Sequence, residues 1–272
     1  MCRLIVSVVV GVCLGLAGAA QAGELSFEIV QSPMGYRAGI NVMQDGVTGA
    51  QISPSGAGMW DSFDGEDNDF WTNSDWYDTL SDLGDELNGS FDLLISRGAE
   101  QSLYTFNLTA PAESAFAPLP QLTAPLTSPV GQSVNFTWTW SPAGAYTWDM
   151  LAGLFVDAWQ EDSDFSNSSF AFMGGTMSKT DTAWHVDFAG TGESEMTVGY
   201  VTMVDGVVTD LTFVAGSSDF QAFDFASGDD DFYQITIAGD GTQFEVVPEP
   251  ATLALLAMGG LAILRRAKSA RR

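Results

Sequence analysis

The chain has 272 residues, of which 35 are acidic and only nine are Lys or Arg, and its formal net charge is −26 at pH 7. The imbalance is concentrated in residues 23–247, where only Arg37, Arg97 and Lys179 face 34 acidic residues, a net charge of −31. Nucleic acids and anionic membrane surfaces are bound through clustered Lys and Arg, so this composition excludes them as partners of residues 23–247. Hydrophobic residues make up 46% of the chain and aromatic residues 12%, which excludes an intrinsically disordered protein.

The first 22 residues, MCRLIVSVVVGVCLGLAGAAQA, have the pattern of a cleaved secretory signal peptide. A basic residue precedes an apolar segment too short to span a membrane comfortably, and Ala20 and Ala22 form an A-x-A cleavage site. Both cysteines, Cys2 and Cys13, lie within this segment. The exported chain therefore has no thiol for a disulfide, a nucleophile or a zinc site.

Residues 23–109 are predicted to form an N-terminal β domain with one short helix. The strand-like segments GINVMQ and VTGAQI flank Asp45-Gly46, which predicts a hairpin because glycine tolerates the positive φ of a type I′ turn. The segment LYTFNL alternates apolar and polar residues as a half-buried strand does. The helix is expected over Leu80–Leu87, where three leucines share one face and Asn88 with Gly89 ends the pattern.

The segment DSFDGEDNDFW, residues 61–71, crowds hard oxygen ligands into one loop. Asp64, Glu66, Asp67 and Asp69 are the candidate ligands, and calcium is the cation that such ligands bind. The spacing differs from that of an EF-hand, and we prefer the interpretation of a solvated acidic loop. The excess of acid over the whole chain leaves the same two interpretations open: solubility, or binding of divalent cations. No other cofactor is expected.

Four aromatic residues, Trp60, Trp71, Trp76 and Tyr77, bracket the acidic loop. Exposed aromatic rings beside carboxylates are typical of carbohydrate-binding sites, where rings stack on sugars and carboxylates accept hydrogen bonds from their hydroxyls. The alternative is that these large side chains belong to the core. The two interpretations remain open for Trp71 and Trp76, whereas the strand alternation around Trp138 and Trp184 favours burial.

The Pro- and Ala-rich segment APAESAFAPLPQLTAP, residues 110–125, is interpreted as a linker, and residues 126–246 as a C-terminal β-sandwich domain. SVNFTWTW and WHVDF alternate as strands, and the second domain resembles an immunoglobulin-like sandwich without its cysteines. Two further hairpins are predicted at Asp205-Gly206 and Asp240-Gly241. The sequence thus predicts a mainly β protein with two antiparallel β-sandwich-like domains.

No catalytic residue is predicted in either domain. The one histidine, His185, lies between the core-facing Trp184 and Val186, so its side chain is expected to point to solvent. No serine has the sequence context of an activated nucleophile. The acidic run Asp229–Asp231 is a weaker candidate for metal binding than the loop above, because neighbouring residues of an extended chain point in opposite directions.

The segment VPEPATLALLAMGGLAILRRAKSARR, residues 247–272, combines three features. Pro248, Glu249 and Pro250 are expected to form a stiff extended segment. Residues 251–264 are expected to form an apolar helix that is marginal as a membrane span. Arg265 and Arg266 begin a basic cluster that is expected to hold the C-terminus in the cytoplasm.

This tail resembles the PEP-CTERM sorting signal. The resemblance implies that an exosortase, a membrane-embedded transpeptidase, is the partner that recognises the tail and removes the helix. It implies an inner-membrane intermediate, then release to the cell surface or extracellular matrix of a Gram-negative bacterium that makes extracellular polysaccharide, the setting of a biofilm. We expect a non-enzymatic structural or surface role. The alternatives are a carbohydrate-binding module, calcium-dependent or not, that contacts exopolysaccharide, and a secreted glycan hydrolase.

Overall fold

The computed structural model describes residues 24–44, 46–59, 61–66, 68–123, 127–141, 146–160, 166–170, 177–188, 190–216 and 232–247. The predicted signal peptide, and the sorting tail from Pro248 onward, lie outside these ranges. As predicted, the protein is mainly β, and its strands form three sheets.

The largest sheet has nine strands. In spatial order these are β13 (Ser166–Phe170), β12 (Gly153–Gln160), β15 (Gly192–Met203), β17 (Phe232–Val247), β1 (Glu24–Ser32), β2 (Gly35–Met43), β6 (Asp69–Asn73) and β5 (Asp64–Glu66), with β10 (Thr127–Pro129) paired to the end of β17. A three-stranded sheet contains β14 (Ala183–Asp187), β11 (Ser133–Thr139) and β9 (Gln121–Thr123). A five-stranded sheet contains β16 (Val208–Gly216), β8 (Glu100–Leu108), β7 (Gly89–Arg97), β3 (Gly49–Pro54) and β4 (Asp61–Ser62).

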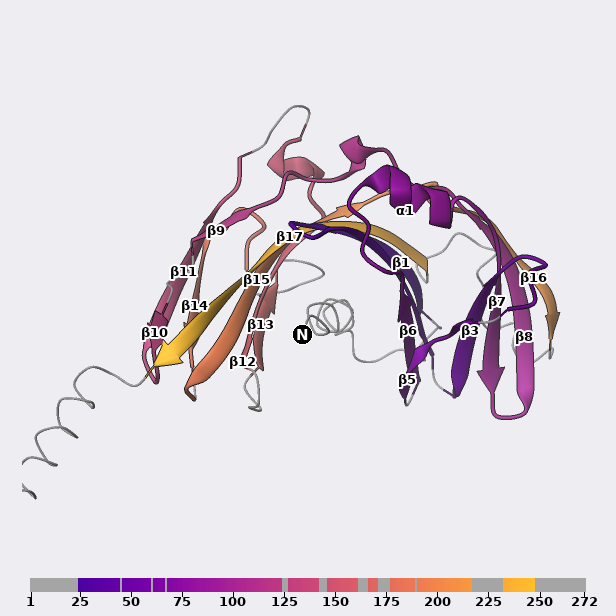
Figure 1. Cartoon of the computed structure of the whole chain (residues 1–272), viewed down its shortest axis with the longest axis horizontal. Coiled ribbons are helices and arrows are strands. Elements are labelled where there is room, and N and C mark those ends of the chain that lie inside the picture. Colours follow the sequence, from indigo (N-terminus) through magenta and orange to yellow (C-terminus); the bar gives the residue numbers. More distant parts are fainter. Residues whose placement is uncertain are drawn as a thin grey trace, which may run out of the picture.

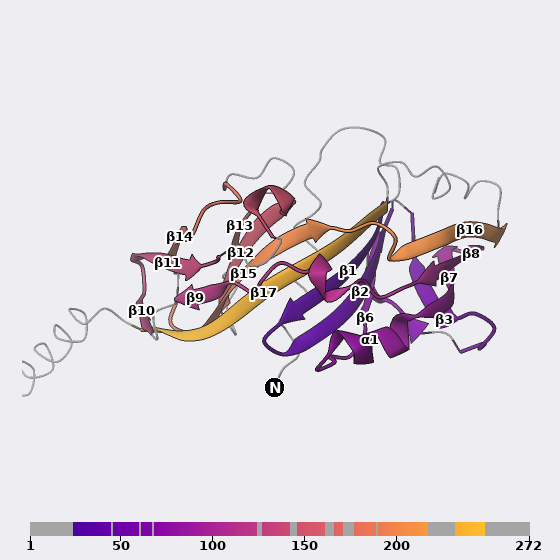
Figure 2. The same cartoon turned by 90° about the horizontal axis from the view of Figure 1, so that it is seen from above.

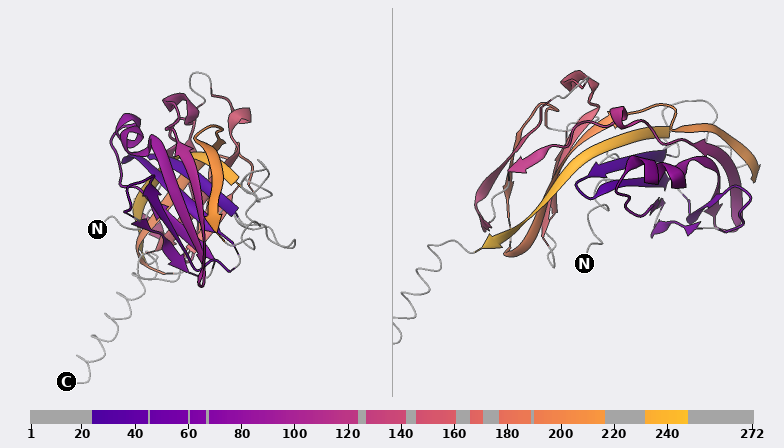
Figure 3. Two further views of the ribbon diagram at one scale, coloured as in Figure 1. Left: turned by 90° about the vertical axis from the view of Figure 1, so that its right-hand side faces the viewer. Right: turned by 45° about the horizontal axis from the view of Figure 1, so that its top comes forward.

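The nine-stranded sheet is bent into an arch, with β17 and β1 at its top (Figure 1). The three-stranded sheet covers the outer side of one leg and the five-stranded sheet covers the outer side of the other. Seen from above, β17 runs diagonally across the molecule from one leg to the other (Figure 2), and the tilted view of Figure 3 shows its curvature. The molecule is therefore two sandwiches that share one continuous sheet.

Each sandwich has its own apolar core between its two sheets. The N-terminal core contains Phe27, Ile29, Leu83, Leu93 and Tyr104, all at most 3% exposed. The C-terminal core is more aromatic, and its fully buried side chains include Phe136, Phe188, Leu154, Met196 and Tyr200. Both cores arise from the alternation that the sequence showed, because every second residue of these strands points between the sheets.

A third cluster lies on the opposite, inner face of the arch. Its buried members are Val30, Phe155, Val201, Ile235 and Ile237, contributed by β1, β12, β15 and β17. These strands therefore carry apolar residues on both faces near the top of the arch. We call this cluster the inner-face cluster.

The spatial division of the chain differs from the division by sequence at residues 110–125. The strand β16 lies in the five-stranded sheet beside β8, and β17 pairs with both β1 and β15. Two strands that follow the segment 110–125 thus complete the N-terminal sandwich. The β1–β17 pairing is parallel, so the expectation of purely antiparallel sheets is wrong at this junction. The two strands come from opposite ends of residues 23–247, and no hairpin constrains their relative direction.

The segment expected to be a linker is packed against both sandwiches. It contains the 3-10 turn η2 (Glu113–Ala115) and the strand β9. Phe116 belongs to the N-terminal core and meets Tyr36 edge to face at 5.4 Å, while the next residue, Ala117, belongs to the C-terminal core. The Ala115 carbonyl accepts hydrogen bonds from the hydroxyls of Tyr146 and Thr236.

The helix α1 spans Leu80–Leu87, as predicted. Thr79 is its N-cap, and the Thr79 hydroxyl accepts a 3.1 Å hydrogen bond from the backbone N–H of Asp82. The three leucines of the helix are buried, and Asn88 forms its C-cap. The helix packs on the N-terminal core beside β2.

The three predicted Asp-Gly hairpins are wrong. The turns at Gly46 and Gly206 do have positive φ, 83° in each case, but each connects strands of different sheets. Asp240 and Gly241 lie inside the continuous strand β17. The tight turn was correctly recognised in two cases, yet a turn motif does not specify whether the chain returns along the same sheet or crosses to another. Hairpins occur instead at Ser32–Gly35 and Arg97–Glu100, which join β1 to β2 and β7 to β8.

Candidate functional site

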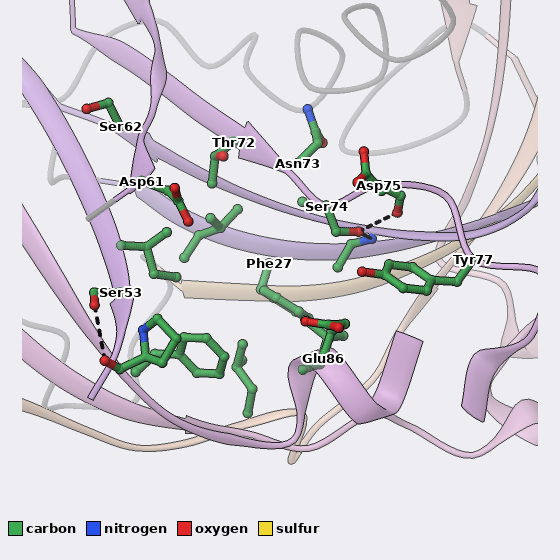
Figure 4. Close-up of a pocket in the computed structure, with 18 residues that line it drawn as sticks. Phe27, Ser53, Asp61, Ser62, Thr72, Asn73, Ser74, Asp75, Tyr77 and Glu86 are labelled. Atoms are coloured by element: carbon green, nitrogen blue, oxygen red, sulfur yellow. Dashed lines mark hydrogen bonds between the residues drawn. The ribbon is translucent and has the colours of Figure 1, made fainter. Parts of the chain in front are cut away.

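A pocket of about 530 Å³ opens between the two sheets of the N-terminal sandwich (Figure 4). Its apolar floor is formed by core-facing side chains of both sheets and of α1. These are Phe27, Ile40, Ile52, Pro54, Leu87, Phe91 and Leu108. A concave site with an apolar floor and a few polar groups is the usual form of a small-ligand site.

The polar rim of the pocket comes from three elements. Asp61 and Ser62 lie on β4, Thr72 and Asn73 on β6, and Glu86 on α1. Figure 4 shows Asp61 at one end of the pocket, and Glu86 toward the other. These short elements are held by the sandwich, so the polar groups surround a preformed opening.

The connection between β6 and α1 supplies the remaining rim residues, Ser74, Asp75 and Tyr77. The backbone of Tyr77 is bonded to that of Tyr36 in both directions, at 2.8 and 2.9 Å. Close approach at this point requires Gly35, which has a φ of 112° and where an added Cβ would lie 2.1 Å from the Tyr77 carbonyl oxygen. The Ser74 hydroxyl accepts a 3.0 Å hydrogen bond from the Ala38 N–H, which fixes the start of this connection.

The pocket is acidic. Its lining contains the carboxylates of Asp61, Asp75 and Glu86, and none of its described lining residues is Lys, Arg or His. Burial raises the pKa of the Tyr77 phenol, and the charges of Glu86 and Asp75 raise it further. The Tyr77 hydroxyl is therefore held in its neutral form, in which it both donates and accepts a hydrogen bond. Together the rim can accept hydrogen bonds from several hydroxyl or amino groups of one ligand.

The predicted calcium ligands lie on the hairpin of β5 and β6. Asp64 pairs with Trp71, and Glu66 pairs with Asp69, across this hairpin. The Asp69 carboxylate accepts a 2.7 Å hydrogen bond from the Asn41 side-chain amide. Asp67 and the side chain of Glu66 lie outside the described residues. Among the residues that the structure does describe, no three acidic or histidine side chains are grouped to hold a metal, and the loop site stays a prediction.

The aromatic residues near this loop separate onto two faces of the sandwich. Tyr77 lines the pocket. Trp76 packs against the inner-face cluster, and the Arg37 guanidinium lies 5.1 Å from the centre of its ring. Trp71 is half-buried, and Trp60 lies outside the described residues. Of the four candidates for sugar stacking, the structure brings only Tyr77 to the described pocket.

The other predicted positions add no functional group to the pocket. His185 is exposed on β14 opposite Asn135, as expected. Trp138 is buried and donates a 3.0 Å hydrogen bond to the Tyr200 hydroxyl, and Trp184 packs against the C-terminal core. The sorting residues, the cleavage site and Asp229–Asp231 lie outside the described ranges, within which no helix has the length and hydrophobicity to span a bilayer.

Three buried carboxyl groups were not predicted from the sequence. Glu28 on β1, Asp157 on β12 and Glu195 on β15 are between 3% and 8% exposed, and all three lie on the inner face of the arch. Burial raises the pKa of Glu28 to about 7, opposed by the charge of Arg37. Burial and then the charge of Glu195 raise the pKa of Asp157 to about 6. An available signal was the single acid in the otherwise apolar strand GLFVDAW, which implies burial on both faces.

Comparisons with known proteins give one specific match, which concerns the tail, and distant structural matches. A search of curated proteins gave no match. The fold is similar to the FN1–FN3 domains of chicken CNTN1, with a TM-score of 0.24 and 8% identity over 70% of this chain and 62% of that one. It is also similar to the chicken interferon gamma receptor alpha chain, with a TM-score of 0.23 and 10% identity over 73% of this chain and 97% of that one. The chain thus spans less than two thirds of the CNTN1 fragment, and likenesses of this size carry no argument about function.

The specific match concerns the tail. Residues 246–272 match the model of the PEP-CTERM protein-sorting motif, and the first two of these residues are the last two of β17. The sorting signal predicted from Pro248, Glu249, Pro250 and the following basic cluster is thereby confirmed. The chain carries a PEP-CTERM sorting motif and is an exported, cell-surface-sorted substrate of an exosortase.

Proposed function

We propose that the protein is a non-enzymatic structural component of the cell surface or extracellular matrix. The observation that carries this proposal is the path of β17. This strand pairs with β15 over twelve residues and with β1 over seven, belongs to the sheet shared by both sandwiches, and runs directly into the sorting motif. Any attachment made through the tail is therefore joined, without an intervening linker, to the strand that holds the two sandwiches together.

This geometry suits a protein that bears load. A pull on the end of β17 is directed along the strand, so that the hydrogen bonds to its neighbours on both sides are loaded together in shear. The end of the strand is reinforced by β10, which pairs with Glu245–Val247, and by the Val130 N–H, which donates to the Val247 carbonyl at 2.9 Å.

The proposal is tested by deleting the gene for the chain and restoring it with the wild-type protein or with Pro248→Ala/Pro250→Ala. We expect the wild-type protein to remain in the matrix fraction after a high-salt wash and to restore matrix cohesion. The double variant should accumulate as precursor in the inner membrane, because the apolar helix extends backwards through the recognition segment. Recovery of the processed wild-type protein only as a free species in the medium would contradict a structural role.

A second function, carbohydrate binding, is favoured by the pocket of the N-terminal sandwich. Its volume, apolar floor, hydroxyl groups and three carboxylates suit one or two sugar units that carry hydroxyl or amino groups. The absence of basic groups among the described lining residues argues against an acidic sugar, because a buried negative charge needs a partner. We therefore propose neutral or amino sugars of an exopolysaccharide as the ligand class.

Titration of the exported protein with neutral, amino and acidic oligosaccharides tests this second function. Asp75→Asn and Glu86→Gln should weaken binding, whereas Asp187→Asn, an exposed acid on β14 of the other sandwich, should leave it unchanged. Equal binding by all three variants would place the sugar site elsewhere. Consumption of the oligosaccharide during the titration would instead indicate a glycan hydrolase and contradict the non-enzymatic role.

A further inference from the structure

The inner face of the C-terminal sandwich carries a polar row that neither the pocket nor the acidic loop includes. Asp157 on β12 lies directly opposite Thr197 on β15, and Thr197 lies directly opposite Gly241 on β17. Glu195, two residues before Thr197 on β15, pairs with Gln243 of β17. Side chains alternate along a strand, so those of Asp157, Glu195 and Thr197 all project from the same face.

Both carboxyl groups of this row are buried with an unpaired oxygen. Asp157 and Glu195 are each 3% exposed. Asp157 Oδ1 and Glu195 Oε1 have no hydrogen-bond partner among the described residues. Lys179, the basic residue of the C-terminal half, is engaged elsewhere, because its Nζ donates a 2.8 Å hydrogen bond to the Leu151 carbonyl. A buried carboxylate is stable only when it is paired, protonated or bound to a metal.

Gly241 leaves space for these oxygens. A Cβ added to Gly241 would lie 3.0 Å from Glu195 Oε1 and 3.3 Å from Thr197 Oγ1, so the two oxygens converge over the glycine backbone. Gly241 does not have a positive φ, and it lies within a continuous strand. The backbone therefore gives no reason for a glycine here, whereas the space above it does.

The two carboxyl groups also interact unfavourably with each other. Burial raises the pKa of both, and the charge of Glu195 raises the pKa of Asp157 further, to about 6. The side chain of Gln243 bonds the Glu195 carboxyl and lowers its pKa. A bound cation would remove both the repulsion and the cost of burial, and two carboxylates with a hydroxyl are hard oxygen ligands.

We infer that Asp157, Glu195 and Thr197 bind one divalent cation of the calcium class on the inner face of the C-terminal sandwich. Three oxygen ligands from two adjacent strands, completed by water, match the irregular coordination that calcium accepts. Zinc and copper are disfavoured because the row contains no nitrogen or sulfur ligand. The site lies near the edge of the nine-stranded sheet formed by β12 and β13, whereas the predicted calcium loop lies at the opposite edge, on β5 and β6.

The test uses the exported protein stripped with a chelator and then titrated with calcium while the melting temperature is followed. Terbium, a luminescent substitute for calcium, gives a second readout, because Trp159 lies opposite Glu195 and can transfer excitation energy to a nearby ion. We expect saturable stabilisation by calcium. Asp157→Asn and Glu195→Gln should each weaken the affinity by at least about tenfold. Trp159→Phe should lower the terbium emission and leave the calcium-induced shift in place.

Two further variants separate loss of the site from loss of the fold. Gly241→Ala keeps every ligand but places a methyl group where Glu195 Oε1 and Thr197 Oγ1 converge, so it should weaken calcium binding in a folded protein. Asp69→Asn removes a carboxylate of the predicted loop site on β5 and β6, keeps an oxygen that can accept from the Asn41 amide, and should leave the titration unchanged. The inference is overturned if Asp69→Asn abolishes the calcium effect while Asp157→Asn retains it. It is equally overturned if no divalent cation raises the melting temperature and acidification alone does, because the two carboxyl groups then share a proton.

Discussion

Carboxyl groups are buried on the inner face of the arch on both sides of the inner-face cluster, and the charge of their neighbours differs between the two sides. On the N-terminal side, Glu28 lies close to Arg37, whose charge lowers the pKa of the Glu28 carboxyl against the effect of burial. On the C-terminal side, Asp157 and Glu195 lie close to each other, and the charge of Glu195 raises the pKa of Asp157. The buried carboxyl group of the N-terminal side thus has a cationic neighbour, Arg37, whereas that of the C-terminal side has an anionic neighbour, Glu195.

This difference shows that the pKa of a buried acid depends on its neighbours on the adjacent strands. The register places Gly39 opposite Glu28, and a Cβ on Gly39 would lie 3.2 Å from Glu28 Oε1. On the other side Gly241 has the same relation to Glu195 Oε1, at 3.0 Å. Both sides therefore use a glycine on the neighbouring strand to make room for a carboxyl group. The two sides differ in the charge beside the carboxyl group, which is positive for Glu28 and negative for Asp157.

Removal of the built-in cation should have the largest effect. Arg37→Met leaves the buried Glu28 without a positive charge nearby, and loss of a neighbouring opposite charge that lowers a carboxyl pKa destabilises by about 1.5–4 kcal/mol. Chemical denaturation at about pH 8 measures this loss of the free energy of unfolding. The Arg37→Met/Glu28→Gln double variant should regain a large part of it, because no charge is then left unpaired. Additive effects of the two substitutions would show that Arg37 does not compensate Glu28.

The pH dependence of stability should identify Glu28 as the acid that Arg37 compensates only in part. Its pKa in the folded protein, about 7, lies above its ordinary value of 4.5. The stabilising contribution of Glu28 is therefore fully present below pH 4.5 and is lost as the pH rises through about 7. The full shift corresponds to roughly 3 kcal/mol.

Glu28→Gln should remove this part of the pH dependence, which is measured as the difference in unfolding free energy between wild type and variant across the same pH range. The variant should be more stable than wild type at about pH 8 and less different from it below pH 4.5. A constant difference at every pH would mean that Glu28 has the same pKa in the folded and unfolded protein.

On the C-terminal side, removal of one acid should stabilise the protein when no cation is available. In the presence of a chelator, Asp157→Asn relieves both the burial of a charge and the repulsion from Glu195, and we expect a gain of about 1–2 kcal/mol at about pH 7.5. Removal of the charge beside a buried carboxyl group thus stabilises the protein on this side, whereas Arg37→Met destabilises it on the N-terminal side, so the sign of the effect distinguishes the two sides. A lower unfolding free energy for Asp157→Asn in chelator would contradict the comparison.

The local part of this architecture could be predicted from sequence, because it depends on residues close together in the chain. The leucine spacing and the Thr79 cap specify α1, and period-two alternation identifies β8 and β11 with their buried faces. The sorting motif was equally recognisable, because all of its parts lie in one segment of the tail.

The inner face could not be predicted because it depends on pairings between distant segments. Ile235 faces Glu28 across a parallel pairing of strands that lie some 200 residues apart. Asp240 and Gly241 resemble a turn until the register shows Gly241 beneath Glu195 and Thr197. The pocket likewise joins β4, β6 and α1, and nothing local in the sequence indicates that Asp61 and Glu86 share an opening.

The smallest predicted effect concerns the aromatic partner of Arg37. The Trp76 ring, 5.1 Å from the guanidinium, holds this cation by a cation–π interaction and packs against the inner-face cluster. Such interactions contribute about 0.5–1 kcal/mol at partly exposed sites. A double-mutant cycle with Trp76→Leu and Arg37→Met isolates this coupling from the loss of packing, because the packing term is present in both backgrounds. On the C-terminal side, Trp159 has no described cation beside it, so Trp159→Leu should show no coupling to Arg37→Met. Absence of coupling at Trp76 as well would mean that the ring does not stabilise the Arg37 guanidinium. The sign of the charge beside the buried acid would then be the remaining difference between the two sides.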